Sequence, residues 1–140
     1  MIFVSGKPLR PGAEFTARNH LEGGDKIPTD FECDGCSKCP DYWPPGYPEA
    51  RQVPLVLACV VHDAERAYEE AHYKELTVEQ YMINRIEADF RLRRNWRKLA
   101  EVYSERIKSW PRIRQWQLRV LIRVGFKLVR RFGAQRKEVA

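Results

Sequence analysis

Two adjacent polar residues follow an apolar run and could carry out chemistry. His62 and Asp63 come directly after residues 54–61, which are apolar throughout. An imidazole that titrates near neutrality can take a proton from water, while a carboxylate can bind a cation. Successive side chains of a helix point about 100° apart, so these two cannot pair with each other. They could therefore serve two tasks, one facing a reacting water and one facing a cation.

A second carboxylate lies where a partner for His62 is expected. Asp89 falls on an apolar stripe of the segment 78–109, and the other members of the stripe are Met82, Ile86, Leu92, Trp96, Leu99, Tyr103 and Ile107. A lone carboxylate in a core costs roughly several kcal/mol, so Asp89 should be paired. If the helices packed antiparallel, Asp89 would lie about 2.6 to 3.2 Å from His62. It would then orient the imidazole, and His62 would be the general base.

The loop before the first helix offers oxygen ligands. Asp34, the Gly35 carbonyl and Asp63 are hard ligands of the kind that calcium takes, with water or substrate at the remaining positions. Calcium there would polarise an ester carbonyl and stabilise the oxyanion. With His62 and Asp89, these residues are the parts of a calcium-assisted hydrolase.

Four cysteines leave three interpretations open. Cys33, Cys36 and Cys39 follow C-x-x-C-x-x-C spacing, and Cys59 lies in the helix beyond. Four thiolates could hold zinc or an iron–sulfur cluster. Disulfides, most simply Cys36 with Cys59 and Cys33 with Cys39, would tie the loop to the helix. The third interpretation is four unrelated thiols.

The hydrophobic pattern predicts one domain over residues 1–140 that is mainly α with a small β lead-in. The predicted segments are a β lead-in (1–31, with short strands at 1–4, 14–17 and 26–31), a Cys/Pro/aromatic loop (32–53) and helices at 54–71, 78–109 and 112–132. Pro54 suits a first helical position, and Thr77 with Gln80 could form a capping box.

The third helix is amphipathic and basic. Its predicted core face holds Ile113, Trp116, Val120, Leu121, Val124, Leu128 and Phe132, with Leu118, Ile122, Phe126 and Val129 beside it. The predicted solvated stripe opposite holds Arg119, Arg123, Lys127 and Arg130.

The charge is concentrated at the same end of the chain. The net charge is +6, and residues 111–140 hold nine of the 25 Lys and Arg but one of the 19 acids, so they carry +8 while the rest carries −2. Such a segment suits an acidic protein, an anionic lipid surface or nucleic acid, although no base-reading motif is present. No signal peptide is visible at the start, and the longest apolar run, 53–61, is far too short to span a bilayer.

Two resemblances follow from these motifs. The stretch Ala58-Cys59-x-x-His62-Asp63, with Asp34-Gly35-Cys36 before it and Asp89 after it, resembles the A-C-x-x-H-D helix of secreted phospholipases A2, particularly the short prokaryotic and fungal kind. Over residues 27–133 the chain is also similar to a family of small uncharacterised proteins of tailed bacteriophages, through residues 27–37, His62-Asp63, Ala88-Asp89-x-x-Leu92 and 126–133.

These resemblances imply a fold, a disulfide bond and a function. The first implies an antiparallel pair of phospholipase-like helices, here followed by the basic helix, and a Cys36–Cys59 disulfide. The second implies a structural component of the virion, in its tail, baseplate or neck, assembled in the host cytoplasm among other virion proteins. The alternatives are an active calcium-dependent phospholipid hydrolase that aids genome delivery at a membrane surface, and a basic nucleic-acid-binding module.

Overall fold

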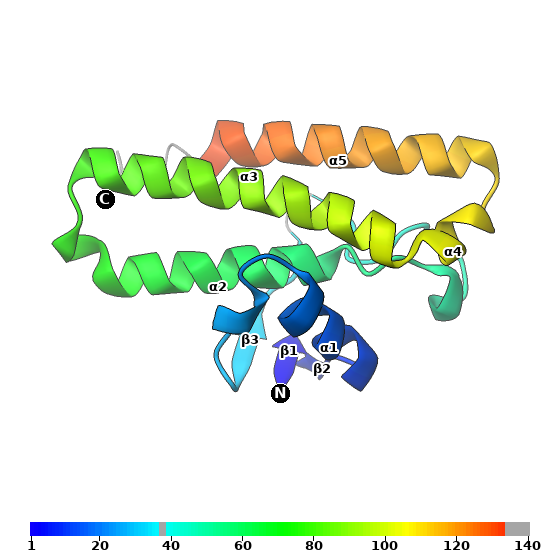
Figure 1. Ribbon diagram of the computed structural model, residues 1–140, viewed down its shortest axis with the longest axis horizontal. Helices are drawn as coiled ribbons and strands as arrows, with labels where there is room; N and C mark the ends of the chain where they lie inside the picture. Colours follow the sequence, from blue (N-terminus) through cyan, green and yellow to red (C-terminus); the bar gives the residue numbers. More distant parts are fainter. Residues whose placement is uncertain (37–38, 134–140) are drawn as a thin grey trace.

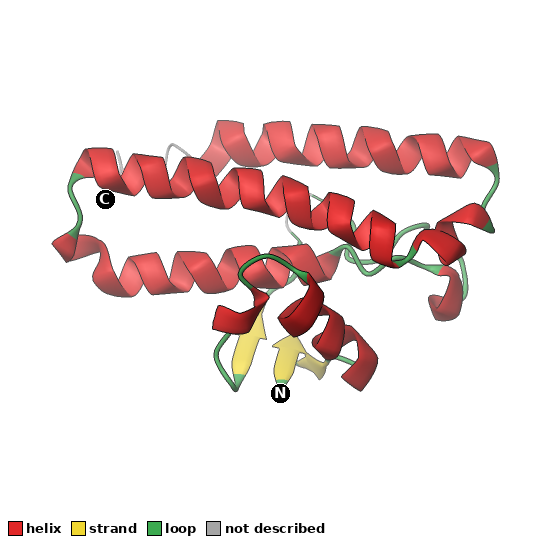
Figure 2. Cartoon of the chain, in the orientation of Figure 1, coloured by secondary structure: helices red, strands yellow, loops and turns green. Residues whose placement is uncertain are grey.

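The structure is a computed structural model that describes residues 1–36 and 39–133. Ser37 of the bacteriophage-like motif and the basic residues Arg136 and Lys137 lie outside the described residues. Within them, the chain is mainly helical with a small sheet at its beginning, as the sequence predicted (Figure 2).

Three short strands form the sheet in the order β2-β1-β3. Strand β1 (Ile2–Val4) pairs antiparallel with β2 (Lys7–Pro8) and parallel with β3 (Phe31–Cys33). The Ser5-Gly6 turn between β1 and β2 has positive φ at both residues, 49° and 78°. Two such residues match the right-handed twist of a tight hairpin, and glycine adopts this conformation without steric cost.

Two of the predicted strands were wrong. Residues 14–17 belong to helix α1 (Pro11–His20), which begins at a proline, a residue whose fixed φ is already helical. Residues 26–31 do not form one strand, because the 3-10 helix η1 (Gly24–Lys26) precedes Pro28 and β3 begins only at Phe31. Short apolar stretches cannot separate helix from strand by periodicity alone.

Three long helices form the body of the molecule. Helix α3 (Val78–Val102) lies between α2 (Val56–His72) and α5 (Arg112–Gly133), while α1 and the sheet pack beside α2 (Figure 1). The short segments between them are η2 (Glu49–Arg51), η3 (Tyr73–Glu75) and α4 (Ser104–Lys108). Leu55, Val60, Trp96 and Leu99 are almost completely buried where α2 and α3 meet.

The predicted helix boundaries needed adjustment. Pro54 precedes α2 by two residues, because its neighbour Val53 is still extended and pairs with Trp43. Thr77 does cap α3 by accepting from the Gln80 amide at 3.0 Å, but the Gln80 side chain donates to Asn84. The predicted single helix 78–109 is interrupted at Tyr103, whose backbone leaves helical geometry (φ −100°, ψ 25°).

Helix α5 is rotated relative to its predicted orientation. Ile113, Trp116, Val120 and Val124, which were predicted to face the core, are exposed by 57%, 57%, 37% and 46%. Leu118 and Ile122 are buried instead, and Phe126 and Val129 pack against the core. Both sides of the helix are apolar, so the hydrophobic pattern alone left its orientation undecided.

Among the described residues, no helix combines the length and the apolar character needed to cross a membrane.

Candidate functional site

The candidate site is built on a contact between His62 of α2 and Asp89 of α3. The His62 Nε2 and Asp89 Oδ1 atoms lie 2.8 Å apart, which confirms the predicted distance. Both residues are buried, with relative exposures of 7% and 1%. Antiparallel packing of α2 on α3 places the last apolar turn of α2 beside Asp89. Within the described chain, the other ring nitrogen of His62, Nδ1, has no hydrogen-bond partner.

Two arginines share the same carboxylate, and sequence reasoning missed both. Arg130 of α5 donates to Asp89 Oδ2 at 2.8 Å, and Arg85, one turn before Asp89 on α3, has its guanidinium 3.7 Å from Oδ1. Arg85 is buried, with 4% exposure. Its i,i+4 spacing from Asp89 was a signal visible in the sequence. Arg130 gave no such signal, because it was counted with the solvated basic stripe of its helix.

The bond from Arg130 also explains the orientation of α5. A buried carboxylate needs a charged or hydrogen-bonding partner, and Arg130 reaches Asp89 only when its side of the helix faces α3. Phe126, one turn earlier, then meets Phe90 at a ring-centroid distance of 5.1 Å. The electrostatic requirement of Asp89 therefore selects which of two apolar faces is buried.

A further acid on α2 lies near this cluster. Burial raises the pKa of Glu69, while the positive charge of Arg85 acts in the opposite direction. Burial likewise raises the pKa of Glu65, which accepts from Arg91 at 2.8 Å. The site is thus a partly buried network of acids and arginines between α2 and α3.

The predicted calcium ligands are arranged around a thiol. The Cys33 thiol donates to Asp63 Oδ2 at 2.9 Å, and the Gly35 amide donates to Cys33 Sγ at 3.2 Å. The Asp34 side chain is exposed. Calcium takes oxygen ligands, so a calcium ion at Asp63 Oδ2 would compete with the Cys33 thiol for this oxygen. Ligation by Asp34, Gly35 and Asp63 stays a prediction.

Asp41 stabilises the loop, a role that the sequence did not reveal. Gly35 has φ +92°, and a Cβ at this position would lie 2.9 Å from Asp41 Oδ1. The same Asp41 oxygen accepts from the Cys36 amide at 2.8 Å. Asp41 therefore holds the loop in the conformation that presents Cys36 to α2.

The cysteines resolve into one disulfide and two thiols. Cys36 and Cys59 are bonded, with their Cα atoms 5.6 Å apart, as the phospholipase resemblance implied. The predicted Cys33–Cys39 disulfide is wrong, because both residues are free and buried. A zinc or iron–sulfur site on all four cysteines is not the arrangement found, since two of the sulfurs are bonded to each other. In the described part of the chain, no group of three or more His, Cys, Asp or Glu side chains is placed to hold a metal.

Comparisons of the chain with models of protein families, with curated proteins and with solved structures gave no match.

The first prediction concerns Asp89. Asp89→Asn removes the negative charge that balances buried Arg85 and the Arg130 contact, so we expect a loss of about 3 to 5 kcal/mol in the free energy of unfolding. Chemical denaturation followed by circular dichroism measures this loss. The matched control Asp25→Asn changes an exposed carboxylate and should stay within about 0.5 kcal/mol of the parent. Equal stabilities of the two variants would contradict the network.

The second prediction concerns the free thiols. Burial raises the pKa of Cys33 and of Cys39 to about 12, with the Asp63 hydrogen bond a second cause at Cys33. We expect iodoacetamide at pH 8, without reductant, to label neither thiol in the native protein and both in guanidinium, as mass spectrometry would show. Rapid labelling of the native chain would contradict their burial.

The raised pKa values of Cys33 and Cys39 make the stability of the protein depend on pH. The native state holds these protons more tightly than the unfolded chain, whose thiols titrate near the ordinary value of 9.0. Their contribution to stability is therefore complete below pH 9 and is lost as the pH rises from about 9 toward 12.

Proposed function

We propose that this protein is a structural component of a bacteriophage particle, associated with the tail, baseplate or neck, which retains a phospholipase-A2-like His/Asp core. The bacteriophage resemblance of residues 27–133 supports the context. The observation that supports a structural use of the core is the sharing of Asp89 among three helices: His62 comes from α2, Arg85 from α3 and Arg130 from α5.

Charge supports the same assignment. A general base must carry a proton in the transition state, so a catalytic His62 would become positive beside Asp89. The one negative charge of Asp89 is already shared with two guanidinium groups. An orienting carboxylate that serves a histidine alone would stabilise that positive charge better.

A calcium-dependent phospholipid hydrolase is the second candidate, and one observation favours it. His62 directs Nε2 to Asp89, which leaves Nδ1 as the nitrogen able to accept a proton from water. In this candidate, Asp89 holds the tautomer and the position of the ring. The contact between Cys33 and Asp63 weighs against it, because the thiol occupies one of the two Asp63 oxygens that calcium could use.

The third prediction separates the two candidates through His62→Ala. For a structural core, the variant leaves a polar group of Asp89 without its partner, and the free energy of unfolding falls by about 1 to 3 kcal/mol. The exposed His20→Ala serves as the control. The purified parent should release no fatty acid from phospholipid vesicles, with calcium or with chelator. Calcium-dependent release that His62→Ala abolishes, while His20→Ala retains it, would instead establish the hydrolase.

A further inference from the structure

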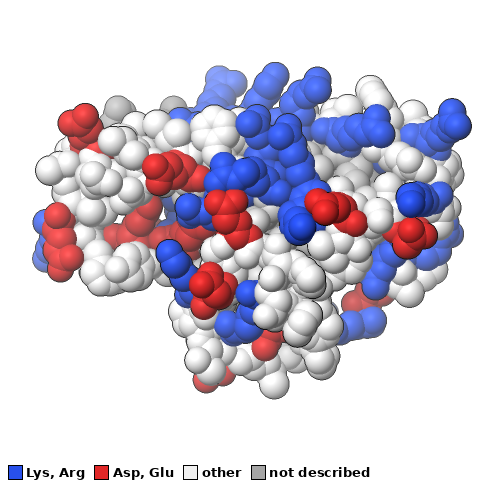
Figure 3. All heavy atoms as spheres, in the orientation of Figure 1, with Lys and Arg blue, Asp and Glu red and all other residues white. Residues whose placement is uncertain are grey.

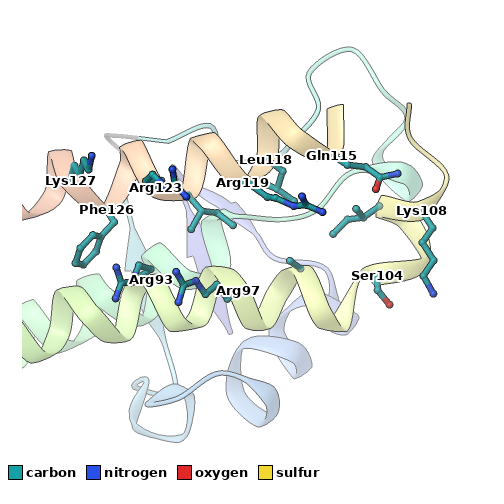
Figure 4. A pocket seen from close by; sticks show the side chains of 13 residues that line it. Arg93, Arg97, Ser104, Lys108, Gln115, Leu118, Arg119, Arg123, Phe126 and Lys127 are labelled. Carbon is teal, nitrogen blue, oxygen red and sulfur yellow. The ribbon is translucent and has the colours of Figure 1, made fainter. Parts of the chain in front are cut away.

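A basic groove runs between α3 and α5. Its volume is about 660 Å³, and its lining comes from α3, α4 and α5. Six cationic side chains line it: Arg93, Arg97, Lys108, Arg119, Arg123 and Lys127. Among the described residues, no acid lines it, and the apolar lining residues are Ala100, Ile107, Leu118, Ile122 and Phe126. Figure 4 shows Arg93 and Arg97 on α3 facing the side chains of α5.

Most of these cations have no acidic partner in the described chain. Arg97, Arg119, Arg123 and Lys127 form no ion pair there, and Lys108 reaches only Glu105 on its own helix, at 3.3 Å. Arg93 lies over the Phe126 ring at 4.3 Å, and its buried Nε has no hydrogen-bond acceptor among the described residues. A row of unpaired cations above a partly apolar floor is complementary to an occupant that carries negative charges with apolar side chains between them.

The first half of α3 presents a surface of that kind. Glu79, Ile83, Ile86, Glu87 and Phe90 recur at spacings of three, four and one, so they share one side of the helix. The three apolar members are exposed by 43%, 37% and 36%. Glu79 and Glu87 are exposed and form no ion pair within the described residues. We call these five residues the acidic face.

The acidic face and the basic groove lie on the same side of the molecule. Arg93 and Arg97 continue along α3 from Phe90 at helical spacing, beyond the five residues of the acidic face. Figure 3 shows separate Asp and Glu side chains among uncharged ones toward the left of the view, where α3 begins, and Lys and Arg side chains gathered over the middle and along the top, where α5 lies. The acidic face is about 17 Å long at 1.5 Å per residue. The α5 residues that line the groove, from Gln115 to Lys127, span about 18 Å on the same scale, so the face can lie along the groove.

We propose that a second copy of this chain occupies the groove, and that each copy places its acidic face in the basic groove of the other. If two copies pack antiparallel about a two-fold axis close to Phe90, the acidic face of each copy meets the basic groove of the other. The same contact then forms twice. The result is a closed dimer. The apolar floor distinguishes this occupant from a nucleic acid backbone, whose phosphates would pair with the arginines but leave the half-buried Ile107 and Phe126 without apolar contact.

A charge-exchange experiment tests the dimer without knowledge of its register. The acid-reversed variant is Glu79→Arg with Glu87→Arg. The base-reversed variant replaces Arg97, Arg119, Arg123 and Lys127 by Glu, which changes the charge of the groove from +6 to −2. Each variant alone sets like charges against each other across both contacts, so dimer affinity should fall at least about tenfold relative to the parent. A mixture should form a heterodimer, because both of its contacts again join opposite charges.

Analytical ultracentrifugation of the full chain measures these affinities, and circular dichroism verifies that every variant is folded. The control Lys7→Glu with Lys26→Glu reverses two charges at exposed sites outside both patches and should dimerise like the parent. A parent that is monomeric at about 200 μM and low salt would overturn the proposal. So would a base-reversed variant that dimerises normally, or a mixture that forms no heterodimer while the parent dimerises.

Discussion

The structure depends on how one buried carboxylate is neutralised. Asp89 is 1% exposed and has neighbours on three helices: the imidazole of His62, the guanidinium of Arg85 and the guanidinium of Arg130. His62 and Arg85 lie against Oδ1 of Asp89, whereas Arg130 is the donor to Oδ2 among the described residues. A buried charged oxygen left without a donor costs about 1 to 3 kcal/mol or more. Both sides of α5 are apolar, so the Arg130 contact favours the orientation in which Leu118 and Ile122 are buried.

The exposed surface follows from the same constraint. With Arg130 turned toward α3, the adjacent arginines of α5 line a groove, and an apolar strip containing Trp116 and Val120 remains in solvent. The electrostatic requirement of the core thus creates surfaces suited to association. This consequence agrees with the proposed structural role, in which α5 contributes binding surface as well as packing.

The sequence predicted the parts of the site that local pattern determines. His62 ends an apolar run and Asp89 lies on an apolar stripe, so their helices could be placed and their contact anticipated. Arg130 could not be anticipated, because a basic residue on an amphipathic helix usually faces solvent and its pairing depends on tertiary packing. The thiol contact of Cys33 with Asp63 escaped for a related reason, since it requires the conformation that Gly35 and Asp41 give to the loop. The failed strand at 14–17 has a local cause, namely a helix that begins at Pro11, which the short stretch Phe15, Thr16 and Ala17 could not outweigh.

The most direct test of the account is a double-mutant cycle between positions 89 and 130. The free energy of unfolding is measured for the parent, Asp89→Asn, Arg130→Met and the double variant, under identical conditions. Because the two side chains share a partly buried contact of 2.8 Å, the account predicts a coupling energy of at least about 1 kcal/mol. A coupling energy near zero would contradict it, since Arg130 would then neither satisfy Asp89 nor determine the orientation of α5.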